Sequence, residues 1–167
     1  MGLLYYLPAD AEVTPIEPDP DADWDDTTIF ERLLAKTAKR SLAMTTVSFS
    51  TTGSSLRAVL FRQLIGDAET AGDIIVGSQT VHMQCLCSSV EGAAWDWFLC
   101  FGLRVLNSDG TIVRKTIVPV TAGGNPTDGA ATLVNRTVSV ISASGNYTIQ
   151  SGDRKVLEIG MKQQFVV

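Results

Sequence analysis

The sequence predicts an all-β protein, an antiparallel two-sheet sandwich of jelly-roll type with an extended N-terminal arm; a closed β-barrel is the alternative. The first observation is composition. Gly, Ser, Thr and Val are plentiful among the 167 residues and only 19% are charged, a bias typical of strands and turns. The second is pattern, because short alternating stretches are separated by turn sequences and leave no room for helical crossovers.

Residues 146–160 give the clearest strand signal, with two extended pieces on either side of a Ser-Gly-Asp turn. The second piece alternates, and its apolar positions are Leu157, Ile159 and Met161. Period-two alternation places such side chains on one face of a strand. We expect this stretch to form the closing hairpin of the domain, with the three apolar side chains facing the strand at 95–105.

Residues 1–27 are predicted to be an extended acidic, Pro-rich arm. Between Asp10 and Asp26 the chain carries several prolines and many acids but no Lys or Arg, so this run cannot bury enough apolar surface to fold alone. An apolar cluster precedes it, made of Leu3, Leu4, Tyr5, Tyr6 and Leu7. We expect this cluster and Trp24 to bind the parent domain or a neighbouring subunit; a disordered tail without a partner is the alternative.

Residues 28–42 connect the arm to the domain. Thr28 and Glu31 have the spacing of a capping box, acids precede them and bases follow, which suits a helix dipole. A short amphipathic helix near 28–40 is one interpretation. An irregular cover over one sheet is the other.

Residues 43–167 are predicted to be the β-sandwich domain, with about eight strands counting the closing pair. The clearest strands are an alternating stretch at 81–87 and the most hydrophobic stretch, at 95–106. Asn107-Ser108-Asp109-Gly110 predicts a hairpin turn that returns the chain antiparallel over 111–118. A long polar loop at 121–129 then leads to an extended stretch at 131–140.

Charge, hydropathy and cysteine usage exclude several classes of function. A net charge of −5 and a pI near 4.7 argue against nucleic acid as a partner. No run approaches the length of a membrane helix, and the apolar opening is stopped by Pro8 without a basic region before it, so no export signal is expected. Three cysteines cannot form a closed disulfide framework. We expect synthesis in a cytoplasm.

Residues with catalytic or metal-binding chemistry are scarce. His82 is the single histidine, and no serine lies in a nucleophile-elbow sequence, so no catalytic residues are expected. Cys85, Cys87 and Cys100 lack the spacing of a zinc site and are expected to be small buried hydrophobes. No metal and no cofactor is predicted.

One acidic residue deserves a second interpretation. Asp96 stands between Trp95 and Trp97, a combination found in sugar-binding clefts. Together with Asn125 and Asp128 of the polar loop it is a candidate for ligand contact. The alternative is that both tryptophans belong to the core while Asp96 faces the other way.

The order of these features resembles a family of small structural proteins of tailed bacteriophages. The similar features are an apolar start, a Pro/Asp-rich lead into Trp24-Asp25-Asp26-Thr27, the hairpin at 103–111, and a close of the type Tyr-x-x-x-x-Gly-Asp-Arg-x-x-x-Glu-Ile-Gly at 147–160. The resemblance implies a β-domain without catalytic residues on a virion surface or in a tail.

A non-enzymatic virion structural protein is therefore the expected function, a capsid decoration or minor surface protein that binds the particle lattice through its arm and a sheet edge. The expected partners are other virion proteins and further copies of the chain, with no nucleic acid and no membrane. A tail-associated or host-surface carbohydrate-binding jelly roll is the alternative. We expect the protein to be made in the host cytoplasm and to reside in the virion.

Overall fold

The computed structural model describes residues 14, 16–27, 30–34, 58–75, 78–85, 95–122, 134–141 and 145–165. In this part of the chain there are nine strands and no helix, so the predicted all-β class is confirmed. The strands are β1 (Glu31–Leu34), β2 (Ala58–Ile65), β3 (Ile74–Ile75), β4 (Ser78–Cys85), β5 (Trp95–Leu106), β6 (Val113–Ala122), β7 (Val134–Ile141), β8 (Tyr147–Thr148) and β9 (Arg154–Phe165).

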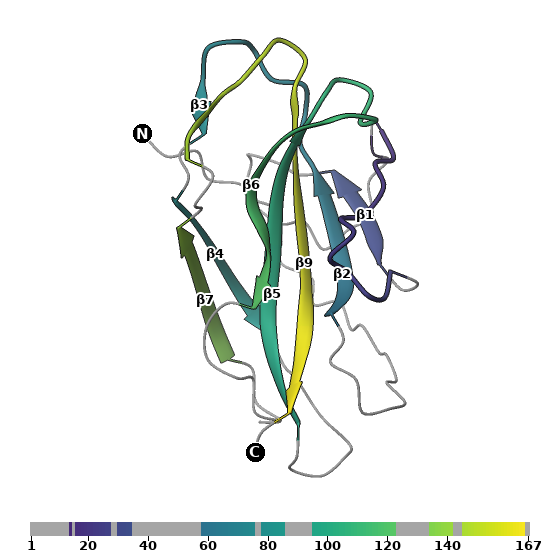
Figure 1. Ribbon diagram of the computed structural model, residues 1–167, viewed down its shortest axis with the longest axis vertical. Helices are drawn as coiled ribbons and strands as arrows, with labels where there is room; N and C mark the ends of the chain where they lie inside the picture. The colour runs from purple at the N-terminus through teal and green to yellow at the C-terminus, as the bar shows by residue number, and fades with distance from the viewer. Residues whose placement is uncertain are drawn as a thin grey trace.

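A five-stranded sheet in the order β1-β2-β9-β5-β6 forms the centre of the fold, and the pairs β3-β8 and β4-β7 make two smaller sheets. All described pairs are antiparallel except β1 and β2. Figure 1 shows the long strands β5 and β9 along the centre of the molecule, with β1 and the β4-β7 pair on opposite sides. The stretches predicted to be extended at 81–87, 111–118 and 131–140 correspond to β4, β6 and β7.

β5 and β9 are the longest strands, twelve residues each, and they pair over their full length. Phe101 lies opposite Ile159 and Leu103 opposite Leu157. The prediction that the apolar residues of the last strand face the 95–105 strand is confirmed for these pairs, because Phe101, Leu103 and Ile159 share one hydrophobic cluster and Leu157 packs against it.

Alternation along the strands gives the five-stranded sheet two different faces, and both are covered. The first, here called the core face, packs against the β3-β8 region through a cluster of Leu33, Leu64, Ile75, Phe101, Leu103, Val105, Ile117, Val118, Ile149 and Ile159. The opposite face carries Ala58, Leu60, Cys100, Leu106 and Val156, packed against Trp24 and Ile16. Because both faces are buried, β5 is apolar at nearly every position, as strands covered on both sides are.

The turn between β5 and β6 forms as the sequence predicts. Gly110 has a φ of 79°, a left-handed conformation that glycine adopts without strain. Asn107 N–H donates to the Ile112 carbonyl, and Ile112 N–H donates back to the Asn107 side chain. The hairpin therefore ends in a rigid turn.

The predicted closing hairpin at 146–160 is wrong in its pairing. Gly152 does form a turn, with a φ of 85°, but β8 pairs with β3, whereas β9 pairs with β2 and β5. The physical reason is length and burial, since β9 gains two long apolar neighbours that a two-residue strand cannot offer.

The described part of the segment predicted as a short helix is a strand. Glu31–Leu34 form β1, which pairs in parallel with β2 from Arg62 to Ile65. Leu33 is fully buried in the core-face cluster. Long-range pairing and burial thus outweigh the local capping pattern. Residues 28, 29 and 35–42 lie outside the described residues.

Gly160 gives a test of how closely the chain packs on the sheet. A Cβ on Gly160 would overlap the Val59 carbonyl oxygen and lie 2.5 Å from Trp24 Cζ3. We expect Gly160→Ala to lower the free energy of unfolding in urea by about 3 kcal/mol or more. Gly66→Ala is the matched control, because its Cβ would meet no atom closer than 3.4 Å. Equal urea midpoints for the two variants would contradict this packing.

Candidate functional site

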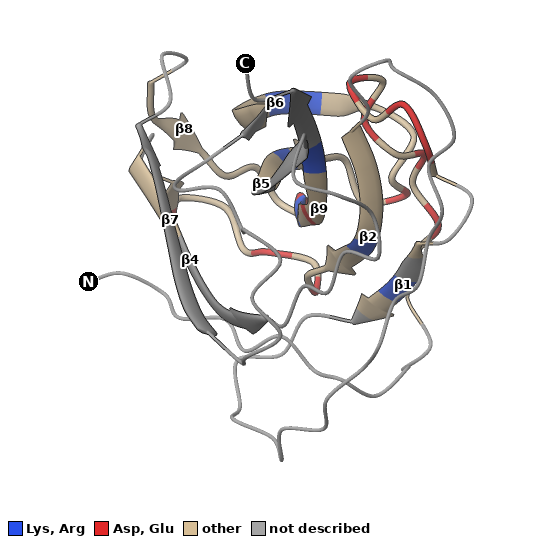
Figure 2. Ribbon diagram, turned by 90° about the horizontal axis from the view of Figure 1, so that it is seen from below, with Lys and Arg blue, Asp and Glu red and all other residues tan. Residues whose placement is uncertain are grey.

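A segment with little regular structure crosses the second face of the five-stranded sheet. It comprises residues 16–27 and is here called the strap, and the face that it covers is the strap face. Figure 2 shows acidic residues gathered along it on the side of β1 and β2. The sequence assigns these residues to an extended arm, yet Trp24 is only 5% exposed and lies in this chain's own core. The second half of the predicted arm is therefore part of the folded body.

The strap ends by joining the edge of β2. Asp25 N–H and Asp26 N–H both donate to the Ala58 carbonyl, and Leu60 N–H donates to the Asp26 carbonyl. The Asp25 carboxylate accepts a further hydrogen bond, from Ala58 N–H at 2.7 Å. Residues 25 and 26 thus run parallel to β2, and β1 continues this parallel pairing further along β2.

Glu158 of β9 is the centre of the strap face. Its carboxylate is fully buried and accepts hydrogen bonds from four groups. Arg104 Nη2 lies 2.6 Å and Gln63 Nε2 lies 2.9 Å from Oε1, and Trp24 Nε1 lies 2.8 Å from Oε2. The fourth donor is Asp21 N–H, at 3.1 and 3.2 Å from the two oxygens. Two of the four donors thus come from the strap and two from the sheet.

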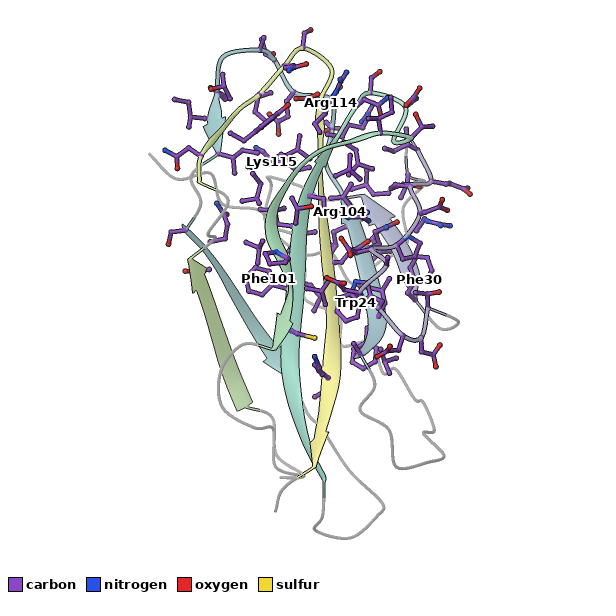
Figure 3. All side chains as sticks on the ribbon, viewed as in Figure 1. Trp24, Phe30, Phe101, Arg104, Arg114 and Lys115 are labelled. Carbon is purple, nitrogen blue, oxygen red and sulfur yellow. The ribbon has the colours of Figure 1, made fainter. Side chains whose placement is uncertain are left out.

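Arg104 of β5 binds both the Glu158 carboxylate and the backbone of the strap. Besides its ion pair with Glu158, its Nη2 donates to the Asp19 carbonyl at 2.8 Å. Its Nε lies 3.5 Å from Asp21 Oδ2 and makes no hydrogen bond. Figure 3 shows Arg104, Trp24 and Phe30 on one side of β9 and Phe101 on the other.

A second arginine extends this contact toward β1. Arg32 donates from Nε to Gln63 Oε1 at 3.2 Å and from Nη2 to the Pro18 carbonyl at 3.4 Å. Its guanidinium also lies 4.9 Å from the ring centre of Phe30, within range of a cation–π interaction. Gln63, which is fully buried, therefore joins Arg32 to Glu158. We call Glu158, Arg104, Gln63 and Trp24 the clamp.

The clamp has the chemistry of an anchor. A general base needs a free oxygen within reach of a substrate proton, and both oxygens of Glu158 are occupied by donors of this chain. Charge-assisted hydrogen bonds of this kind are the stronger ones in proteins. The geometry therefore fixes the strap to the sheet and offers no route to a substrate.

A second polar cluster lies at the start of β9. Asp153 is buried and accepts hydrogen bonds from the Tyr147 hydroxyl at 2.7 Å and from Gln150 N–H at 2.8 Å, while Arg114 Nε lies 3.9 Å away. Desolvation, the hydrogen bond to Asp153 and the charge of that carboxylate raise the pKa of Tyr147 to about 12. The cluster ties the 150–153 turn to β6 and β8.

Three large apolar side chains of the described residues are exposed. Ile74 is 62%, Ile112 is 54% and Val113 is 47% exposed. Ile74 pairs with Thr148 of β8, whereas Ile112 and Val113 lie where β6 begins.

The structure places the other candidate residues as follows. Asp96 of β5 lies opposite Gln164 of β9, and its side chain lies outside the described part. Asn125 and Asp128, like the apolar cluster at 3–7, are also outside the described residues. The predicted contacts of these residues stay predictions.

Cysteine and histidine give no metal centre in the described part of the chain, where no group of three metal-binding side chains occurs. His82 pairs with Thr137 between β4 and β7. Cys100 is buried, as a small hydrophobic residue is expected to be, and burial raises the pKa of its thiol to about 12. Cys85 and Cys87 have no described side chains.

Sequence reasoning missed the two charged residues that matter most, Glu158 and Arg104. In an alternating strand each stands between apolar residues, so the pattern assigns it to solvent. One signal was present in the sequence. Gly160 interrupts β9 two residues after Glu158, and a glycine inside a strand often marks the close approach of another segment.

No protein-family model, no curated protein and no solved structure matches this chain. Among the described residues, no helix is long and apolar enough to cross a membrane. The strap and the clamp are therefore the features of the described residues that bear on function.

The clamp predicts a large effect of one conservative substitution. Glu158→Gln removes the charge that balances buried Arg104, and breaking a buried ion pair in this way costs about 3 to 5 kcal/mol. We expect a matching loss in urea unfolding and faster cleavage inside the strap by a protease specific for acidic residues.

Glu17→Gln is the matched control in the strap itself, because Glu17 is exposed and lies 3.8 Å from Arg32. Exposed pairs contribute about 1 kcal/mol or less. If the two variants were cleaved at the same rate and unfolded at the same urea concentration, the clamp would not hold the strap.

Tyr147 predicts a pH dependence at alkaline pH. Its folded pKa of about 12 lies above the ordinary 10.0, so the unfolded chain releases this proton first and stability falls as pH rises from 10 to 12. Tyr147→Phe has no such proton. Between pH 9 and pH 11 the unfolding free energy of the wild type should fall more steeply than that of the variant, whereas between pH 7 and pH 9 the two should run parallel. Parallel behaviour throughout would contradict the assignment.

Proposed function

We propose that this chain is a non-enzymatic structural protein of a virion. In this proposal it is a capsid decoration or minor surface protein that binds the particle lattice through its N-terminal arm and a sheet edge. The resemblance to phage structural proteins is the starting point, and it includes both Trp24 and Glu158. These two residues are joined by a hydrogen bond at the centre of the clamp.

The clamp is the observation that carries the proposal. An arm that joins a particle must transmit force from its contact to the folded body. Here the strap is fixed by Glu158 and Arg104 of the two central strands, which pair over twelve residues each. Load on residues 1–13 would therefore pass into the middle of the sheet.

The hydrogen bonds that the buried carboxylates accept support a structural role over an enzymatic one. Glu158 accepts hydrogen bonds from four donors and Asp153 from two. Buried acids that serve as catalysts need a proton-accepting oxygen directed at substrate. Both of these acids hold turns and segments of their own chain instead.

The finer form of the fold belongs to the same proposal. We place β3-β8 and β4-β7 in the second sheet of a jelly-roll sandwich, opposite the five-stranded sheet. Ile75 and Ile149 support this placement, because they pack on the core face from the β3-β8 region. Among the described strands β1 and β6 are outermost in the large sheet, and Pro119 on β6 is typical of an edge strand.

Further copies of the chain and other virion proteins are the partners in this proposal, and synthesis takes place in the host cytoplasm. Edge pairing suits such partners, since an added strand gains main-chain hydrogen bonds without a deep pocket. Nucleic acid and membrane are not partners in it.

Deletion of residues 1–13 tests the proposal. The cut stops before Ile16, so the strap and the clamp stay whole, and we expect the unfolding free energy to change by no more than about 1 kcal/mol. The full chain should sediment with purified particles on a density gradient, whereas the shortened chain should stay at the top.

A deletion of residues 1–26 is the contrasting variant, because it also removes Trp24 and should unfold the domain. Absence of the full chain from particles would reject the virion role. Equal incorporation of the full chain and the chain without residues 1–13 would reject the arm.

A further inference from the structure

The turn between β5 and β6 contains a chemically reactive pair, Asp109 followed by Gly110. Glycine has no side chain to shield its backbone nitrogen from the neighbouring carboxyl group. The nitrogen bonds to Cγ of Asp109, and its hydrogen leaves with the carboxyl hydroxyl as water, which closes a succinimide ring. When water opens the ring at the α-carbonyl, Gly110 stays attached to the side chain and residue 109 becomes isoaspartate. Water is the only reagent.

The fold occupies both reacting groups with hydrogen bonds. Gly110 N–H donates to the Asn107 carbonyl at 3.1 Å. Asp109 Oδ1 accepts from the Thr111 backbone N–H at 3.1 Å and from the Thr111 hydroxyl at 2.7 Å. Ring closure requires the nitrogen to give up its hydrogen and the carboxylate to accept one. Each of these bonds opposes that change, because it stabilises the groups as they are.

Thr111 keeps the Asp109 carboxylate in its unreactive, charged form. The bonds from the Thr111 hydroxyl and then from its backbone N–H lower the pKa of the Asp109 carboxyl. An ionised carboxylate resists attack, because its oxygen can leave as water only after protonation. Asp109 itself is exposed, so this protection comes from Thr111 and not from burial.

The packing of Gly110 determines what the modification would disturb. Gly110 is buried, and Ile16 Cδ1 lies 2.7 Å from the position that a Cβ on Gly110 would take. Isoaspartate adds one carbon to the main chain directly before this glycine. The longer main chain would displace Ile16, the residue at which the strap begins.

We infer that Asp109-Gly110 is a latent modification site, a pair that forms isoaspartate and that the folded hairpin keeps unreacted through Asn107 and Thr111. Opening of the turn releases both reacting groups. The modified turn then loses the bond from Gly110 to Asn107 and the contact with Ile16. The inference goes beyond the proposed function and does not depend on it.

Ageing of the purified full chain at neutral pH for several weeks tests the inference. Peptide mass spectrometry with an isoaspartate-specific methyltransferase measures the product at residue 109. The folded wild type should react roughly tenfold or more slowly than the same chain in urea, since ring closure in the fold works against bonds on both reacting groups.

Thr111→Val identifies the protecting group. The substitution removes the hydroxyl bond to Asp109 and a weaker one at 3.3 Å from the Asn107 side chain, and it keeps the backbone N–H. In the folded state it should react about fivefold faster than the wild type, the change expected from one ordinary hydrogen bond. Thr111→Ser keeps the hydroxyl and should react at the wild-type rate.

Reactions in urea are the control, because there the hydrogen bonds of the fold are absent. Wild type and Thr111→Val should react equally in urea, and Asp128-Gly129, the other such pair in the sequence, should match Asp109. Deamidation of Asn107 is distinguished by its mass, which isomerisation of Asp109 leaves unchanged.

Equal rates for the folded and the urea-unfolded wild type would overturn the inference. Equal rates for folded wild type and folded Thr111→Val would overturn the role of Thr111. A Thr111→Val chain that fails to fold would react at the urea rate, and the comparison of the folded wild type with the wild type in urea then decides.

Discussion

The buried ion pair between Glu158 and Arg104 is the constraint on which the rest of the structure depends. Removing two charges from water is costly, and further hydrogen bonds to both groups offset part of that cost. Here the sheet supplies Gln63, and the strap supplies an indole N–H, a backbone N–H and a carbonyl oxygen. Neither part is complete alone, because the strap is too acidic to fold by itself and the sheet would leave its charges half paired.

This dependence explains the two-sided burial of the large sheet. The core face is covered by an ordinary apolar cluster, whereas the opposite face is covered by one strap with a single tryptophan. Trp24 can reach Glu158 only because Gly160 has no side chain. The same path carries Ile16 to the β5–β6 turn, so the strap runs from that turn to the edge of β2.

Local sequence patterns predicted what depends on neighbours in sequence. The alternation of β5 and β9 and the turn at 107–110 belong to this class, and the structure confirms them. Strand order, the β8-β3 pairing and β1 depend on partners 30 or more residues away, as Glu31 opposite Arg62 does, and so alternation cannot reveal them. The clamp could not be predicted from the sequence for the same reason. A glutamate in an alternating strand is assigned to solvent unless the segment that covers it is already known.

The way the sheet binds the strap explains how an acidic segment can lie over a buried acid. The sheet mostly recognises backbone, since Arg104 and Arg32 bind the carbonyl oxygens of Asp19 and Pro18 and Glu158 binds the N–H of Asp21. The carboxylates of residues 17, 19 and 23 are exposed. Binding therefore constrains Trp24 and the course of the backbone, and it leaves these carboxylates in water, where their charges carry little desolvation cost.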